Sequence, residues 1–464
     1  MSEVAMVPVW TTDWPGRDTR RVSETLAAGD RLRHRMTGWF ALCRAERRFD
    51  RFAAHFDFLE PLLDEMAARL LDDAAAPVPG TTGATYDRCR EVERGLAVVA
   101  RLFAWYADKY EQRCDGRLGP VLAAADEVVR SCWAEPFAKV GAARPTGPLT
   151  FVTPQYGACA TIRAAVPRTL KIDAAGIVRE LVGMLPVPTV ALPDTAAEGG
   201  WWLSLVAHEV GHHLEADLDP RLAERTAGVV DPSWSSWSSE LFADVFAVLA
   251  VGEAAGWAVH ELEYTAPAAF FATPVAGTAY PPPAIRLAVI GEAVRRLGTG
   301  TWPPAADEMG DWLRAAAADD PAIDTEPVAA HLARAAATVD ALLDMRVGER
   351  RLGDLIDNRV GWFAPGGRIA EWSGALLKTS SLFPVGLSES ARLAVLAGVR
   401  AYRTELARDA DADALADLHR RLVDAVATAG PDGTLAGEDD LGAAAGPAAR
   451  RCADRVLRFV RESS

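Results

Sequence analysis

The 464-residue chain is poor in cysteine and histidine, with six of the first and eight of the second. No two cysteines form a C-x-x-C pair, which excludes a cysteine metal cluster and a small disulfide scaffold. Scattered single cysteines are typical of reduced thiols in a cytoplasmic protein. The cysteines are Cys43, Cys89, Cys114, Cys132, Cys159 and Cys452.

The sequence also lacks a long apolar run. The most apolar stretch, about residues 241–260, is interrupted by Asp244, Glu253 and His260, whereas a membrane span needs about 20 nearly uninterrupted apolar residues. Residues 1–18 carry acidic residues and prolines, where a secretory signal needs a basic start and an apolar core. We therefore expect no membrane insertion, no export signal and a cytoplasmic location.

Basic charge is in deficit. The chain has 49 Lys and Arg against 64 Asp and Glu, a formal net charge of -15, and the two signs are interspersed. Nucleic acid and anionic membranes attract clustered basic residues, so we expect no nucleic-acid partner. Half of the residues are hydrophobic, which is enough apolar surface for a globular chain.

Helical patterns dominate the chain. Residues 18–75, 86–113 and 118–138 carry apolar side chains three and four positions apart among charged ones, the pattern of amphipathic helices. The segment 301–464 again shows this pattern, with Gly, Pro and Asp breaks. Prolines at 281–283 predict the start of another helix, because proline is tolerated in the first helical turn.

Two short segments have the composition of strands. Residues 143–157 and 187–193 contain β-branched or aromatic runs bounded by Pro and Gly, which predicts a small β-sheet. The sequence therefore predicts a mainly α (α+β) protein in three regions. These are a helical region at 1–142, a core with the small sheet at 143–300, and a helical region at 301–464.

One short motif carries most of the chemical information. Residues 201–218 are apolar on most sides, which predicts a buried helix, and they contain His208-Glu209-Val210-Gly211-His212, an H-E-x-x-H motif. Helical residues four apart lie on one face, so both imidazoles can reach one ion. Chance would place this motif in on the order of one such chain in a hundred. The pattern predicts zinc held by His208 and His212, with Glu209 as general base.

A hydrolytic zinc site needs a third protein ligand, because three such ligands leave the fourth position to water. Glu240 lies 28 residues after His212, at the start of a strongly helical segment, and Asp244 follows one turn later on the same face. We expect Glu240 to be the third ligand. An acidic residue in so apolar a helix needs a partner, and we expect Asp244 to accept the free ring N–H of His208.

The motif HEVGH followed by ELFAD resembles the H-E-x-x-H plus E-x-x-x-D signature of the thermolysin-like, or gluzincin, zinc metallopeptidases. The resemblance covers about residues 187–290. It implies a gluzincin-like zinc peptidase core with an edge strand just before the active-site helix, along which the substrate backbone adds as a further strand. Residues 187–193 stand in the matching place.

Residues 280–286, YPPPAIR, are similar to the H-P-P-x-x-x-R stretch that follows the glutamate ligand in the Ste24/HtpX-like branch of the gluzincins. This chain has Tyr280 where that pattern has His. A phenol can donate a hydrogen bond to a developing oxyanion, so Tyr280 is a candidate catalytic residue. Tyr280 could instead be a core or turn aromatic. Arg286, the arginine of this stretch, could be a structural ion-pair partner.

Other interpretations of the same residues stay open. The metzincin pattern requires Gly and His at the positions of Glu215 and Leu218, which excludes that arrangement. Glu240 could instead be an acidic residue favoured at a helix N-terminus. The next candidate ligands would then be Glu215, Asp217 and Asp219. His213 points about 100° away from the ligand face, which favours a supporting or surface role.

Tryptophans near the motif have two interpretations. They could line an apolar substrate cleft, but buried packing is the commoner fate of this residue type. The residues concerned are Trp201, Trp202, Trp234 and Trp237.

The function predicted from these features is that of a zinc-dependent metallopeptidase that hydrolyses a peptide or protein substrate. In this prediction a zinc-activated water attacks the carbonyl while Glu209 takes up its proton. The alternatives are a zinc-dependent amidase of a non-peptide substrate and a non-catalytic zinc-binding scaffold protein.

Overall fold

The computed structural model describes residues 16–77, 82–162, 176–357, 361–378, 390–429, 435, 437 and 441–462. They form mainly helices and a small mixed sheet, as predicted. None of the described helices is long and apolar enough to cross a membrane.

The chain divides into two compact units. The first comprises Met1–Ala107, Asp173–Leu185 and Asp440–Ser464, and the second comprises Asp108–Ile172 and Pro186–Asp439. Residues 441–462 therefore group with the N-terminal helices, although they lie at the other end of the sequence.

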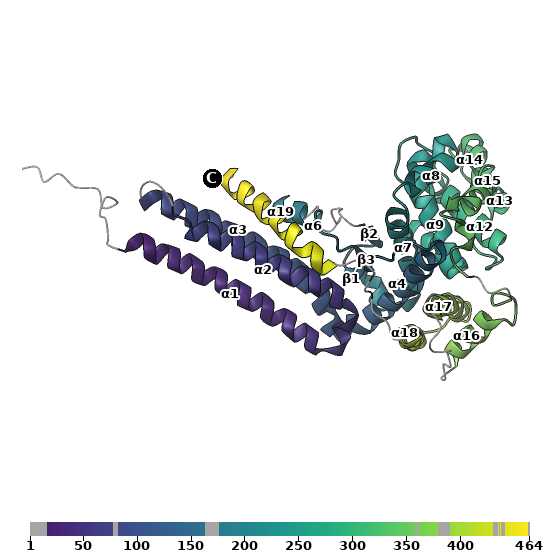
Figure 1. Ribbon diagram of the computed structural model, residues 1–464. Helices are drawn as coiled ribbons and strands as arrows, with labels where there is room; N and C mark the ends of the chain where they lie inside the picture. The colour runs from purple at the N-terminus through teal and green to yellow at the C-terminus, as the bar shows by residue number, and fades with distance from the viewer. Residues whose placement is uncertain are drawn as a thin grey trace, which may run out of the picture. The chain divides into compact units, whose positions relative to one another are not determined.

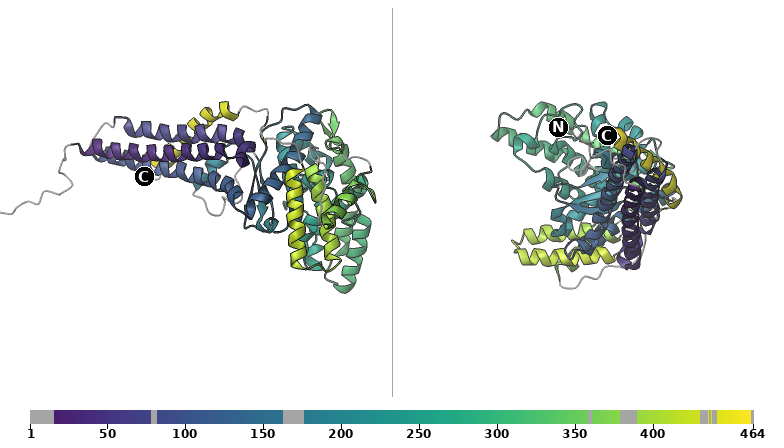
Figure 2. Two further views of the ribbon diagram at one scale, coloured as in Figure 1. Left: turned by 90° about the horizontal axis from the view of Figure 1, so that it is seen from below. Right: turned by 90° about the vertical axis from the view of Figure 1, so that its left-hand side faces the viewer.

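The first unit is a bundle of long helices that lie side by side in Figures 1 and 2. Its elements are α1 (Arg17–Ala45), η2 (Arg47–Phe52), α2 (Ala53–Ala75), α3 (Thr82–Glu111), which continues past the unit's boundary, α6 (Gly176–Val182) and α19 (Leu441–Glu462). Phe40 of α1 packs edge to face against Phe56 of α2 and Phe103 of α3. The apolar stripes that predicted these helices are thus buried against one another.

The second unit contains a three-stranded sheet in the order β1–β3–β2. The strands are β1 (Leu149–Thr153), β2 (Cys159–Thr161) and β3 (Thr189–Pro193). β1 runs parallel to β3, with Leu149 paired to Thr189, and β2 runs antiparallel to β3, with Cys159 paired to Ala191. β1 and β3 confirm the strands predicted within 143–157 and 187–193. All residues of these two strands are buried.

The position of the 187–193 strand within the sheet differs from the expectation. It was expected at the edge, but β3 is the central strand, because β1 and β2 pair with its two sides. A central strand has no free backbone groups with which to accept a further strand. Among the described residues, β2 holds the edge next to the candidate site.

Helices make up the rest of the second unit (Figure 1). They are α4 (Leu118–Val140), α7 (Leu205–Asp217), α8 (Leu222–Val229), α9 (Ser238–Val251), α10 (Glu253–Glu263), α11 (Pro267–Phe270), α12 (Pro283–Leu297), α13 (Ala306–Asp319), α14 (Thr325–Leu332), α15 (Ala335–Asp344), α16 (Arg368–Leu377), α17 (Ser390–Leu406) and α18 (Ala412–Thr428). The start of α12 at Pro283 confirms the prediction from the three prolines. In Figure 2, α17 and α18 lie side by side.

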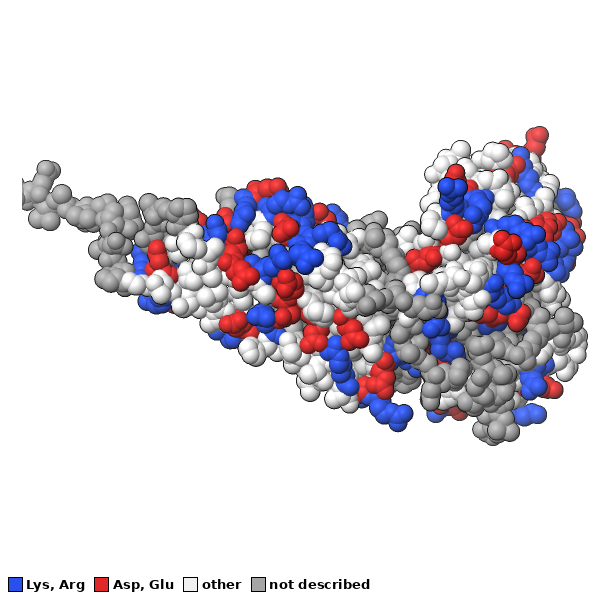
Figure 3. All heavy atoms as spheres, viewed as in Figure 1, with Lys and Arg blue, Asp and Glu red and all other residues white. Residues whose placement is uncertain are grey.

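Short elements connect these helices. They are the 3-10 helices η3 (Gln112–Cys114), η4 (Asp194–Ala197), η5 (Gly200–Ser204), η6 (Pro232–Trp237) and η7 (Leu352–Asp354), and the antiparallel strands β4 (Arg346–Val347) and β5 (Arg350–Arg351). On the face drawn in Figure 3, basic and acidic side chains are interspersed over the helices of each unit. The alternation of charge along the sequence is therefore also found on this face.

Candidate metal centre

Two helices of the second unit carry the candidate ligands. α7 contains the HEVGH motif and α9 contains ELFAD, and the two helices pack directly on each other. Gly211 permits this approach, because a Cβ built there would lie 2.8 Å from the Ala243 Cα. The glycine inside the motif thus brings the ligand-bearing faces together.

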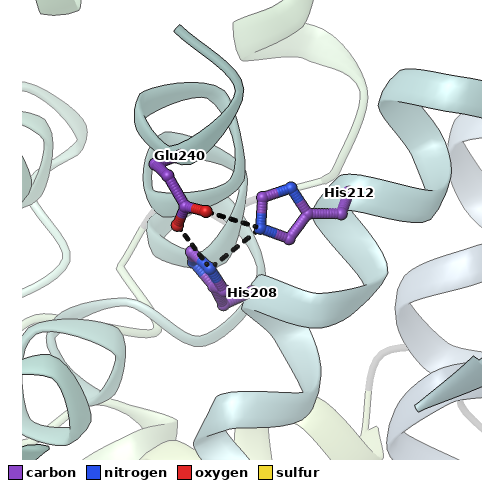
Figure 4. A group of neighbouring side chains, drawn as sticks. All are labelled: His208, His212 and Glu240. Atoms are coloured by element: carbon purple, nitrogen blue, oxygen red, sulfur yellow. Dashed lines mark hydrogen bonds and ion pairs between the residues drawn. The ribbon is translucent and has the colours of Figure 1, made fainter. Parts of the chain in front are cut away.

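His208, His212 and Glu240 form one cluster (Figure 4). The His208 Nε2 atom lies 3.2 Å from His212 Nε2 and 3.4 Å from Glu240 Oε2, and His212 Nε2 lies 3.7 Å from Glu240 Oε1. No other group of three or more His, Cys, Asp or Glu side chains with this spacing occurs among the described residues.

The contact of each Nδ1 atom shows which ring nitrogen of His208 and of His212 carries the proton. His208 Nδ1 lies 2.8 Å from Asp244 Oδ1, and an ionised carboxylate only accepts, so the proton of a neutral His208 belongs on Nδ1. His212 Nδ1 lies 3.2 Å from Ser239 Oγ, whose hydroxyl donates to Glu215. That hydroxyl has a single proton, so the serine oxygen accepts from His212. In the neutral rings, both Nε2 atoms therefore present lone pairs to the cluster.

Three lone-pair donors face one another at short range, which calls for a cation between them. Ligand atoms around a tetrahedral zinc at about 2.0–2.2 Å lie about 3.3–3.6 Å apart, close to the 3.2, 3.4 and 3.7 Å observed here. The buried Glu240 Oε2 lies 3.4 Å from His208 Nε2 and 3.6 Å from Arg286 Nη2, both longer than a typical N–H···O hydrogen bond. The cluster fits a His2Glu metal site that leaves further positions to water or substrate.

The electrostatics of the metal-free cluster show the same demand for a cation. Burial alone would lower the pKa of His208, but the charge of Asp244 and hydrogen bonding to Asp244 and Glu240 outweigh it and raise that pKa to about 10. Burial would raise the pKa of Glu240, but hydrogen bonds with His208 and His212 hold it far below its ordinary value. The carboxylates of Asp244 and Glu240 therefore favour a positive charge at His208.

Arg286 of α12 holds the acidic side of the site in place. Its Nε and Nη2 atoms donate to Asp244 Oδ2 and Oδ1 at 2.8 and 2.9 Å, and its Nη1 atom donates to Glu263 of α10. Burial would raise the pKa of Asp244, but the charges of Arg286 and His208 lower it. Asp244 therefore stays ionised beside His208, and Arg286 is a buried ion-pair partner, the structural role considered for it.

A cavity of about 770 Å³ opens at the cluster. Glu209, Tyr280 and the three clustered residues line it, and residues 157–162, which include β2, form part of its wall. Glu209 is 5% exposed and Tyr280 is 40% exposed, and the Tyr280 ring centroid lies 5.9 Å from the guanidinium carbon of Arg286. The edge strand, the cluster and Glu209 thus share one cavity.

The remaining candidates have other contacts. His213 is fully buried, and its Nε2 atom lies 3.2 Å from the Thr189 carbonyl oxygen, which fastens α7 to β3. Asp219 pairs with Arg225. Trp234 and Trp237 are buried, and Trp201 stacks on Tyr402. Among the described residues that line the cavity there is no tryptophan.

One arrangement near the ligands was not foreseen from the sequence. Ser239, next to Glu240 in the chain, contacts both His212 and Glu215. The serine-rich run 233–239 gave no sign of it, because the identity of the contacting hydroxyl depends on how α9 is rotated against α7.

Searches with the whole chain found no matching family model, no matching curated protein and no matching solved structure.

Proposed function

We propose that the chain is a zinc-dependent metallopeptidase with a gluzincin-like core. The observation that carries the proposal is the meeting of two imidazole Nε2 atoms and the Glu240 carboxylate in one cavity that Glu209 also lines. A structural zinc site is usually closed by four protein ligands, whereas three ligands beside a cavity are typical of catalytic zinc.

Each of the residues at the cavity has one role in this proposal. His208, His212 and Glu240 would hold the metal, and Asp244 orients His208. Zinc bound there would supply a Lewis acid and lower the pKa of its water towards ~7. Glu209 removes a proton from the attacking water and delivers it to the leaving amine. Tyr280, whose side chain lines the cavity, donates a hydrogen bond to the developing oxyanion.

A peptide substrate is supported by the strand beside the cavity. β2 pairs with β3 on one side, and its residues Cys159, Ala160 and Thr161 line the cavity that contains the cluster. An extended peptide can add to such an edge through backbone hydrogen bonds, which are independent of side-chain identity. The edge role that the gluzincin resemblance implies is thus proposed for 159–161 instead of 187–193.

The first test is metal content measured by elemental analysis on the wild-type, His208→Ala and Glu240→Ala proteins, each checked for folding by circular dichroism. We expect about one zinc per wild-type chain and loss or weakening of zinc in both variants. Zinc retained by Glu240→Ala would move the third ligand elsewhere. Failure of the wild type to bind added zinc would refute the proposal.

The second test separates catalysis from metal binding. Glu209→Gln keeps the size of the side chain but removes the base, so we expect zinc to be retained and cleavage of a peptide library to fall by about 10²–10⁴-fold. A wild type that binds zinc but cleaves neither peptides nor small amides would indicate a scaffold protein. Cleavage of small amides alone would indicate an amidase.

A further inference from the structure

A hydrogen-bonded chain of side chains connects His212 to Ser239 and Glu215, which also line the cavity. His212 Nδ1 lies 3.2 Å from Ser239 Oγ, and the Ser239 hydroxyl donates to Glu215 Oε2. Glu215 follows His212 by three residues on α7, and Ser239 directly precedes Glu240 on α9. The chain therefore connects the two ligand-bearing helices at the level of the ligands.

Glu215 is an unusual residue to bury. It is 5% exposed where it lines the cavity, and it forms no ion pair with any described Lys, Arg or His side chain. Its Oε1 atom is buried and accepts no hydrogen bond within the described part of the chain. A buried carboxylate without a cationic partner is costly. Among the described residues, the group that could hold a metal cation is the cluster that His212 joins.

With Glu215 ionised, the proton count along this chain has one solution. The ionised Glu215 can only accept, so the proton of the Ser239 hydroxyl points to it, and the Ser239 oxygen is left to accept from His212 Nδ1. His212 Nε2 then carries a lone pair aimed at the cluster. Glu215 thus determines, through Ser239, which nitrogen of His212 is available to a metal.

We propose that Ser239 and Glu215 are positioning residues that hold His212 in its metal-binding tautomer and orientation, and that the Glu215 charge strengthens metal binding. The proposal rests on the zinc site proposed above. The two histidines are then supported differently, because Asp244 lies directly against His208 whereas Glu215 acts on His212 through a hydroxyl. Removal of such outer partners typically costs 10–100-fold in metal affinity.

The test measures the zinc dissociation constant by competition with a chromophoric chelator, together with the thermal denaturation midpoint of each metal-free protein. Ser239→Ala should weaken zinc binding by about 10–100-fold, and Ser239→Thr, which keeps the hydroxyl, should restore most of it. The matched control is Ser238→Ala, because Ser238 donates to the Ser235 carbonyl oxygen. This control should bind zinc like the wild type.

Glu215→Gln separates positioning from a purely structural role. Gln removes a buried charge that lacks a cationic partner, so the metal-free variant should be at least as stable as the wild type. It should nevertheless bind zinc more weakly. A structural role would instead lower the denaturation midpoint and leave the zinc affinity unchanged.

The outcomes distinguish this inference from the proposed function. Wild-type protein that binds no zinc would refute the proposed function itself. Wild type that binds zinc while Ser239→Ala and Glu215→Gln bind it equally well would overturn the positioning role alone. Weakening in Ser239→Ala that Thr fails to restore, or that Ser238→Ala shares, would also overturn it.

Discussion

The substitution Asp244→Asn replaces one oxygen by an NH2 group and removes one charge beside His208. Three nitrogen atoms lie against this carboxylate, with His208 Nδ1 at 2.8 Å and Arg286 Nη2 at 2.9 Å from Oδ1, and Arg286 Nε at 2.8 Å from Oδ2. Asparagine has only one acceptor oxygen. Whichever way the amide turns, its NH2 group meets at least one of these donors.

The size of the effect follows from these contacts. Loss of the partner that orients a ligand histidine typically weakens metal binding by about 10–100-fold, or about 1.4–2.7 kcal/mol. Loss of a hydrogen bond to a charged group costs about 1.5–3 kcal/mol of folding stability. Asp244→Asn should therefore lower both the zinc affinity and the denaturation midpoint.

A matched control separates the two effects. Asp126 is also buried, and Arg113 Nη2 donates to its two oxygens at 3.0 and 3.2 Å. Asp126 belongs to no metal-binding cluster among the described residues. Asp126→Asn should lower the denaturation midpoint while its zinc dissociation constant, measured by chelator competition, matches that of the wild type. Equal zinc affinities of wild type and Asp244→Asn, or equal losses in the two variants, would refute the role of Asp244.

Two further predictions concern the same site. Asp244 and Glu240 raise the pKa of His208 to about 10, so zinc must displace a proton from His208 at lower pH. The zinc affinity should therefore rise about tenfold per pH unit from pH 7 to 8.5; an affinity that is flat above pH 7 would show that no such proton is held. Gly211→Ala should lower the stability by about 1–3 kcal/mol and weaken zinc binding, because the new Cβ would lie 2.8 Å from the Ala243 Cα. Gly228→Ala, where a Cβ meets nothing within 4 Å, should do neither in the same denaturation and zinc titrations.

The local parts of the fold were accessible from the sequence, and the long-range parts were not. Apolar periodicity predicted α1, α2, α3 and α4, and the composition of 187–193 predicted β3, because both signals depend on neighbouring residues. The packing of α19 on α2 joins residues from opposite ends of the chain, and no periodicity encodes it. β2 was missed because three residues are too few for an alternation to be recognised.

In the candidate site, too, the local features were predicted from the sequence and the features that depend on packing were not. The spacing of His208 and His212 places both on one helical face, so the motif alone predicted their meeting. The approach of Glu240 required a second helix at the correct distance, which the gluzincin resemblance supplied. The roles of His213 and Ser239 depend on the rotation of α7 against β3 and α9. Packing over the whole second unit determines that rotation. The spacing of residues along one helix does not predict it.

The cluster is held together by protein contacts that do not involve a metal. Gly211 sets the approach of α7 to α9, His213 fastens α7 to β3, and Arg286 ties α9 to α10 and α12 through Asp244 and Glu263. These contacts are made by residues other than the three candidate ligands. The candidate ligand atoms lie 3.2–3.7 Å apart, so little reorganisation would oppose the zinc binding proposed above. A site arranged in this way differs from metal-dependent small domains, in which the ion itself drives folding.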